Sequence, residues 1–534
     1  MPVILLLLPI LLLLVIPGIL ILVHLLKPGF RYSWLIMVTT SLLAWLIVLL
    51  ERLRLSISIT LDAWGTSVIV PGSFSLLVDE TSWPYLLAIA SLTLALLMTE
   101  VARRPASDTG RQTWSSRVAS LVIAALGLLA VMTGDLFSLL LAWTALDMAE
   151  LLIRLGSASR PVDSERVIIA FSGRAVSLLI LVGLSATARS QSFQSMSTQA
   201  SMWLLIAAGL RLGALPLNLP LVETRLPQRG ADVQLSFVPA AVALVIVART
   251  ASIGVPDSAL LILLILACMA ALYGGLSWAS AQDAAHAQPY WIVGMAALAI
   301  LSALVKQPYA SLAWGLALFL PGSLIALYSL PHRRLLPLLA LGLAGILTLP
   351  FTPAWQGVRL YASPGESWTF QGWWAPALLA QALLITGYIR HALQPTSSQA
   401  IAERWIWLVY PWGLALLPLA HFLILWFGIP GLRDGIQAFP SLVESWPGLA
   451  SLALAAPLLA WLRGGRHPPE WLATALHKIF SFGWLYRILW VVYRGVGRVA
   501  YLIERIFESE GGILWTLLVL TLLLAMLIQF TAGG

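Results

Sequence analysis

The sequence predicts an all-α fold class, a polytopic membrane protein built from transmembrane helices. Of the 534 residues, 60% are hydrophobic and only 10% are charged, and the mean hydropathy is +0.91. About 25% of the residues of a soluble globular protein are charged. In addition, apolar runs of about 17–25 residues recur along the chain, each long enough to cross a hydrocarbon core of about 30 Å as a helix.

These runs predict about sixteen transmembrane helices, with ends defined to within about two to four residues. The first run has no basic residues before it and no small-residue cleavage site after it, so we expect a retained helix and not a signal peptide. The expected spans lie near 3–26, 34–50, 84–101, 117–134, 136–155, 166–188, 201–220, 234–251, 258–277, 289–305, 310–329, 335–350, 371–391, 404–428, 446–462 and 512–531.

The segment 469–507 does not fit a span, because it is amphipathic and basic. Four arginines follow spacings of seven, four and seven, which place them on one face of a helix: Arg487, Arg494, Arg498 and Arg505. We expect a helix along the cytoplasmic surface, anchored by the last span at 512–531. The alternative is a basic helix that touches anionic lipid and nothing else.

The basic residues indicate an orientation in the membrane and not a nucleic-acid partner. The net charge is +8, but the basic side chains are spread through short loops and do not form one patch. Most fall in one set of alternate loops, which places those loops in the cytoplasm by the positive-inside rule. We therefore expect a multi-pass protein of the cell (inner) membrane, with its N-terminus outside and the loop around 103–117 inside.

Two expected helices carry paired prolines near their ends. Pro216 and Pro220 lie in the seventh span, and Pro350 and Pro353 lie at the end of the twelfth. Proline frees a helix carbonyl, which a bilayer tolerates where the segment is buried in protein or lines a cavity. Broken helices at corresponding places in two halves indicate an inverted-repeat transporter. The alternative is that the prolines simply end two helices.

Five charged residues fall within three consecutive spans. Asp147, Glu150 and Arg154 are three and four residues apart, so they share one face of the fifth helix. Arg174 lies in the sixth span, and Arg211 lies between two glycines in the seventh. We expect Arg211 to form an ion pair with Asp147 or Glu150, because isolated charges in a membrane are costly. The cluster is either part of an ion path or a fixed set of ion pairs, since arginine is effectively always protonated.

The second half of the chain offers fewer candidates for an ion path. Asp283 and His286 lie at the start of the tenth span and Lys306 at its end. The sequence contains no phosphate-binding loop, dinucleotide fingerprint, catalytic triad or His/Cys cluster, so we expect no catalytic residues, metal or cofactor. The single Cys268 lies in an apolar stretch, where a buried thiol is the simplest interpretation.

Six short motifs resemble the antiporter-like subunits of respiratory complex I, a family that includes subunits of membrane-bound hydrogenases and Mrp-type antiporters. The motifs cover roughly residues 60–360 in the family's order. They are Phe74–Ser82, Leu140–Trp143, Ala170–Arg174, Arg211–Leu217, Phe319–Ser323 and Leu349–Thr352.

The resemblance implies a domain organisation. It places two inverted five-helix repeats at 117–251 and 258–391, after N-terminal helices at 1–116. The C-terminal helices at 404–462, the surface helix at 469–507 and the last span at 512–531 are similar to the distal, largest member of the family.

The resemblance also implies a proton path, from which this sequence departs. In the family a glutamate of the fifth helix pairs with a lysine of the seventh, and further lysines continue the path. Here Thr144 stands at the glutamate position and Arg211 at the first lysine position. The later lysine positions correspond to Ala285, Trp314 and Gly357. Asp147 and Glu150 are the nearest carboxylates that could replace the glutamate.

The sequence therefore favours an antiporter-like membrane subunit of a complex-I-like assembly, involved in proton or cation translocation with degraded conduction. Its expected partners are other membrane subunits, the lipid bilayer, and protons or monovalent cations. At most it is a non-catalytic subunit of a proton-translocating oxidoreductase. The alternatives are a structural docking subunit without conduction and a stand-alone secondary transporter for a small solute.

Overall fold

The computed structural model describes most of the chain. The described residues are 2–27, 30, 32–54, 57–61, 74–102, 110–157, 161–187, 193–215, 231–330, 332–362, 374–394, 406–427, 445–463, 490–491, 494–495, 497–499, 501 and 521. Contacts divide the chain into two units, Met1–Phe480 and Ser481–Gly534, and the helical bundle belongs to the first.

Nine helices in the described part of the chain are long and apolar enough to cross a membrane. They are α1 (Pro2–Leu26), α2 (Ser33–Glu51), α3 (Ser82–Thr99), α5 (Leu136–Ser157), α9 (Ala231–Ala251), α10 (Asp257–Ser280), α11 (Ala284–Leu304), α12 (Pro308–Leu327) and α15 (Ile406–Phe427). The other α-helices of the bundle are α4 (Gly110–Val131), α6 (Pro161–Ala170), α7 (Ser172–Thr187), α8 (Thr198–Leu212), α13 (Leu336–Ala344), α14 (Trp374–Ala392) and α17 (Trp446–Arg463). The predicted polytopic helical fold is confirmed, whereas the count of sixteen spans is not.

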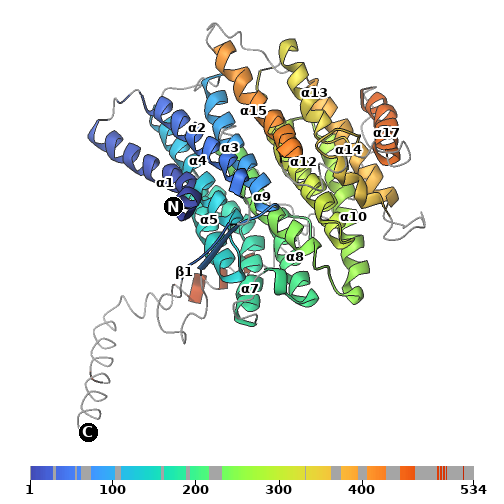
Figure 1. Ribbon diagram of the computed structural model, residues 1–534, viewed down its shortest axis with the longest axis horizontal. Helices are drawn as coiled ribbons and strands as arrows, with labels where there is room; N and C mark the ends of the chain where they lie inside the picture. Colours follow the sequence, from blue (N-terminus) through green and yellow to red (C-terminus); the bar gives the residue numbers. More distant parts are fainter. Residues whose placement is uncertain are drawn as a thin grey trace. The chain divides into compact units, whose positions relative to one another are not determined.

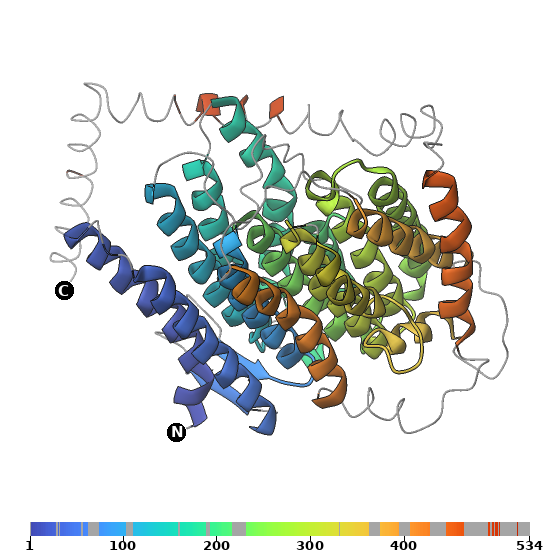
Figure 2. The same ribbon diagram turned by 90° about the horizontal axis from the view of Figure 1, so that it is seen from above.

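The core of the first unit is formed by its central helices. In the most apolar 18-residue stretch of α9 and of α12, 94% of the residues are buried. In the corresponding stretches of α1 and α2, the buried share is 33%. Figures 1 and 2 show α1 and α2 at one side of this unit and α17 at the opposite side. Small residues allow close packing inside: a Cβ atom on Gly274 of α10 would lie 2.6 Å from the Cα atom of Gly294 in α11. Several large apolar side chains of α1 and α2 are exposed, among them Leu22 and Leu43.

Two predicted spans end or break earlier than the sequence suggested. The span at 166–188 is two helices, α6 and α7, separated at Phe171 just before Ser172 and Gly173, which favour helix poorly. The span at 201–220 ends at Leu212, because Gly213 adopts a left-handed conformation (φ 72°) and closes α8. Pro216 and Pro220 lie outside the described residues.

The twelfth predicted span, at 335–350, is also shorter than expected. Helix α13 stops at Ala344, where Gly345 lies so close to His421 that a Cβ atom would be 2.6 Å from the imidazole Nδ1. Pro350 and Pro353 follow in a turn, in which Phe351 has a positive φ of 65°. The 3₁₀-helix η5 (Trp355–Tyr361) comes next, so the chain is indeed interrupted here.

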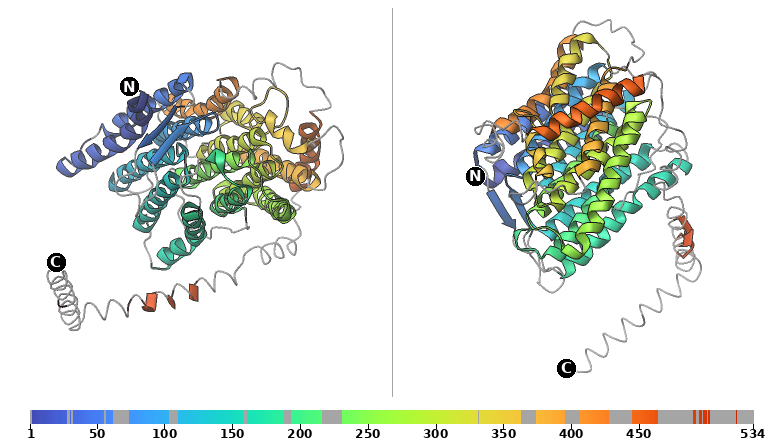
Figure 3. Two further views of the ribbon diagram at one scale, coloured as in Figure 1. Left: turned by 60° about the horizontal axis from the view of Figure 1, so that its bottom comes forward. Right: turned by 90° about the vertical axis from the view of Figure 1, so that its right-hand side faces the viewer.

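A β-hairpin, which the sequence analysis missed, lies between α2 and α3. Strand β1 (Ile57–Leu61) pairs antiparallel with β2 (Phe74–Val78), with Ile57 opposite Val78. The Leu77 N–H donates to Met132 O at 2.6 Å, so β2 also contacts the turn between α4 and α5. Figure 3 shows the hairpin at one end of these helices. The first predicted motif, Phe74–Ser82, is thus a strand followed by the start of α3.

The predicted surface helix at 469–507 and the last span at 512–531 lie almost entirely outside the described residues. The few residues of these segments that the structure describes are helical. Their position relative to the membrane stays a prediction.

Candidate functional site

The buried face of α5 carries both carboxylates that the sequence singled out. Asp135 accepts a hydrogen bond at 2.7 Å from the Ser138 N–H and so caps the beginning of the helix. Three turns later, Asp147 and Glu150 are 6% and 0% exposed. Burying two carboxylates in a membrane bundle requires cationic partners, and these come from two other helices and from α5 itself.

Arg211, in the last turn of α8, forms a two-pronged ion pair with Asp147. Its two terminal nitrogens donate to Asp147 Oδ2 at 2.7 Å and Oδ1 at 2.5 Å. The guanidinium carbon also lies 4.2 Å from the centre of the Trp143 ring. This fork geometry combines charge with two aligned hydrogen bonds, and a cation near the C-terminus of α8 is favoured by the helix dipole. The predicted ion pair is therefore present.

Glu150 is held by the other two arginines. Arg154, one turn later on α5, donates from Nε to Glu150 Oε1 at 2.8 Å. Arg174 of α7 donates to Glu150 Oε2 and lies 3.6 Å from Asp147 Oδ1, so it joins the two carboxylates. We refer to Asp147, Glu150, Arg154, Arg174 and Arg211 as the five-charge cluster.

The five-charge cluster is suited to holding helices together. Its three cations are arginines, which stay protonated at any physiological pH, and both carboxylates are bound by them. Thr144, which the sequence resemblance aligns with a glutamate, is exposed and donates to the Leu140 carbonyl of its own helix at 2.7 Å. Proton transfer through this cluster would require a carboxylate to leave its arginine.

The candidates of the second half lie apart from this cluster in the described part of the chain. Asp283 and His286 form an exposed pair, with 3.0 Å between Oδ2 and Nδ1. Lys306 is exposed in the turn after α11, where it has a positive φ of 59°. Trp314 is fully buried, and a Cβ atom on Gly357 would lie 2.9 Å from its ring.

A neutral hydrogen-bond network, which the sequence analysis did not foresee, is buried in the second half. The Tyr361 hydroxyl donates to Gln381 Oε1 at 2.8 Å, and Gln381 Nε2 donates to Thr348 Oγ1 at 3.1 Å. It joins η5, α14 and the segment after α13. Neutral groups satisfy each other here, whereas the first half relies on charge. Among the described residues, no three His, Cys, Asp or Glu side chains gather closely enough to hold a metal ion.

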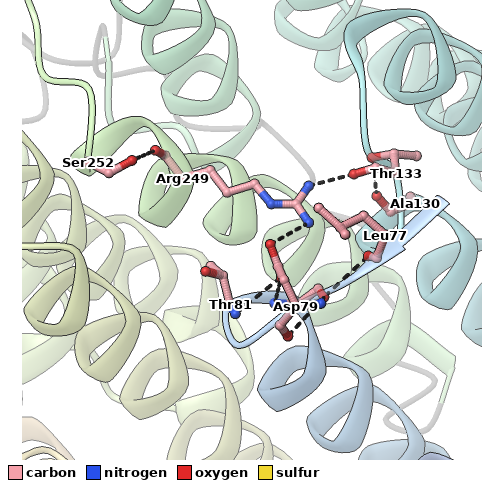
Figure 4. A network of polar contacts seen from close by, with 8 residues as sticks. Leu77, Asp79, Thr81, Ala130, Thr133, Arg249 and Ser252 are labelled. Carbon is pink, nitrogen blue, oxygen red and sulfur yellow. Dashed lines mark hydrogen bonds and ion pairs between the residues drawn. The ribbon is translucent and has the colours of Figure 1, made fainter. Parts of the chain in front are cut away.

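A second ion pair, also missed from the sequence, fixes the hairpin to the bundle (Figure 4). Arg249, near the end of α9, lies 3.4 Å from Asp79 Oδ2 and donates to the Thr133 carbonyl at 2.6 Å. Asp79 Oδ1 accepts from the N–H of Ser82 at 2.7 Å, at the start of α3. One arginine thus connects the hairpin, α9 and the turn between α4 and α5.

We predict that the stabilising effect of Asp79 is lost in acid. Burial disfavours the Asp79 carboxylate, but Arg249 and the hydrogen bonds from Ser82 outweigh it, so the pKa of Asp79 is lowered. A lowered pKa means that the contribution is complete above the unfolded value of about 4 and disappears as the pH falls through the folded value. Thermal unfolding of the protein and of Asp79→Asn should therefore differ at pH 7, and the difference should shrink as the pH falls through the lowered pKa of Asp79. A difference that does not change with pH would contradict the prediction.

Comparisons with known proteins identify the fold. No family model and no curated protein sequence matches the chain. The solved structures that resemble it include a chain of the Mrp complex from Dietzia sp. DQ12-45-1b (14% identity, TM-score 0.71). This match covers 98% of the present chain and 63% of the other, so the chain spans less than two thirds of that relative's length.

Two further structures resemble the chain over nearly their whole length. One is a chain of the membrane-bound sulfane sulfur reductase, an archaeal respiratory membrane complex (16% identity, TM-score 0.61, covering 97% of this chain and 99% of that one). The other is a chain of respiratory complex I from Thermus thermophilus (17% identity, TM-score 0.57). This match covers 85% of the present chain and 99% of the complex I chain. At such identities the likeness establishes a shared fold.

Proposed function

We propose that this chain is an antiporter-like membrane subunit of a complex-I-like assembly and takes part in proton or cation translocation with weakened conduction. The shared fold with chains of three multi-subunit membrane complexes supports the assembly. The observation that carries the proposal is the ion pair between Asp147 of α5 and Arg211 of α8. This pair joins a carboxylate in the fifth predicted span to a cationic side chain in the seventh, which is the arrangement that the sequence resemblance implies for an antiporter-like subunit.

We attribute the weakened conduction to the arginine at position 211. A lysine can lose its proton when it is buried, whereas an arginine keeps its proton and holds a carboxylate in a fixed fork. Arg211 therefore secures Asp147 and does not relay protons to it. The buried Trp314 and the small Gly357 supply no further titrating group to continue a path.

The same proposal includes the domain organisation. Residues 117–251 and 258–391 form the two inverted repeats, and the interruption after α13 in the second repeat corresponds to the end of α8 in the first. The ion-path candidates are the five-charge cluster with Asp283, His286 and Lys306, and the prolines at 216, 220, 350 and 353 mark the broken helices. The partners are other membrane subunits, lipid, and protons or monovalent cations.

Labelling should place the N-terminus outside the cell membrane and residue 108 in the cytoplasm, as the basic loops predict. Replacing Cys268, which is buried, by alanine and Asp108 by cysteine gives a single reactive thiol. An impermeant maleimide should label this thiol in inverted membrane vesicles and not in intact cells. Labelling in intact cells would reverse the proposed orientation.

Affinity purification from the native membrane in a mild detergent tests the assembly. An antiporter-like subunit should be recovered with sister membrane subunits and hydrophilic redox subunits, identified by mass spectrometry. Recovery of the chain alone, together with uptake of a small solute by vesicles that contain only this chain, would favour the stand-alone transporter. Recovery in an assembly without ion flux would favour the structural subunit.

A further inference from the structure

The five-charge cluster has one more cation than carboxylates among the residues that the structure describes. In this described part of the chain, three guanidinium groups face two carboxylates, which leaves a net charge of +1. Asp147, Glu150 and Arg211 are buried, whereas the Arg154 and Arg174 side chains are 14% and 18% exposed. Glu150 is shared by Arg154 and Arg174, and Asp147 is bound by Arg211. A net charge in a region of low dielectric is costly unless a counter-ion compensates it.

Three buried hydrogen-bond donors of the same helices have no acceptor among the residues that the structure describes. They are Arg211 Nε of α8, Trp143 Nε1 of α5 and Ser177 Oγ of α7. All three side chains are no more than 1% exposed. Trp143 lies under the Arg211 guanidinium, and Ser177 follows Arg174 by three residues on the same face of α7. Unsatisfied buried donors are rare, so each requires an explanation.

We propose that α5, α7 and α8 bind a monovalent anion of the size of chloride at these donors. The excess charge and the unpartnered groups indicate the same ligand, because an indole N–H and a guanidinium N–H can only donate. A bound water molecule would satisfy the donors but would leave the net charge. An anion satisfies the donors and makes the cluster neutral. The site is independent of the proposed translocation, since the anion stabilises the cluster whether or not protons move.

The anion site is tested on the purified full chain by unfolding in detergent, with gluconate replaced by chloride at constant ionic strength. A ligand of the folded state, at free concentration L, stabilises it by RT ln(1 + L/Kd), so the rise of the unfolding midpoint with chloride concentration yields an apparent Kd for chloride. Trp143→Phe keeps an aromatic ring under Arg211 but removes one donor, and it should raise this Kd by at least about tenfold. Trp314→Phe is the matched control, because it removes another buried indole N–H that has no described acceptor.

A second variant separates charge from hydrogen bonding. Arg154→Gln lowers the charge of the cluster from +1 to 0 and leaves Arg174 on Glu150, so it should also weaken chloride binding. In crystals grown in bromide, the unmodified chain should show an anomalous peak within hydrogen-bond distance of Trp143 Nε1 or Arg211 Nε, a test that needs no variant. Absence of that peak, or equal chloride titrations for Trp143→Phe and Trp314→Phe, would overturn the proposal.

Discussion

Replacing Arg211 by alanine should lower the free energy of unfolding by about 3–5 kcal/mol, because the change leaves a buried carboxylate without its main partner. Asp147 would keep only Arg174, whose nearest nitrogen lies 3.6 Å from Oδ1. The contact between the guanidinium and the Trp143 ring would be lost as well. The free energy of unfolding in a mixed-micelle denaturant series, measured at pH 8, gives the effect directly.

Two further variants serve as controls for this loss. Arg117→Ala breaks an ion pair with Glu100 whose side chains are 21% and 18% exposed, and it should cost about 1 kcal/mol or less. Adding Asp147→Asn to Arg211→Ala removes the unpaired charge and should recover a large part of the stability. A loss for Arg211→Ala no larger than that for Arg117→Ala would show that the pair does not hold the helices together.

Much of the bundle was predictable because the membrane restricts the choice of structure. A run of apolar residues in lipid must form a helix, so spans such as 3–26 and 136–155 agree with α1 and α5 within a few residues. The pair of Arg211 with a carboxylate was predictable for the same reason: a charge at that depth needs a partner.

Other features depend on partners that are remote in sequence. The ion pair that holds the hairpin joins Asp79 to Arg249, 170 residues later, and nothing in the local pattern of either residue indicates the other. The strands of the hairpin are five residues each, too short for alternation to stand out beside long apolar runs. At the end of α13, Gly345 packs against His421, 76 residues later, and this tertiary contact has no local sequence signal.

Replacing Arg211 by lysine should increase proton flux through the reconstituted protein. The substitution keeps a positive charge beside Asp147, but it introduces an amine whose proton can leave when the group is buried. The fork of two hydrogen bonds becomes a single contact, so the carboxylate is also freer to exchange a proton. Stability should fall less than for Arg211→Ala, because the charges stay paired.

Proton flux into proteoliposomes, followed with an internal pH-sensitive dye under an imposed membrane potential, tests the role of Arg211 most directly. Vesicles with the unmodified chain and vesicles with the Arg211→Lys variant are compared at equal protein density. Protein-free vesicles with the same passive proton leak through the lipid serve as the reference. We expect low flux with the unmodified chain and a clearly higher flux with Arg211→Lys. Flux at the level of protein-free vesicles for both proteins, with a change only in the unfolding midpoint, would contradict a translocating subunit and support a purely structural one.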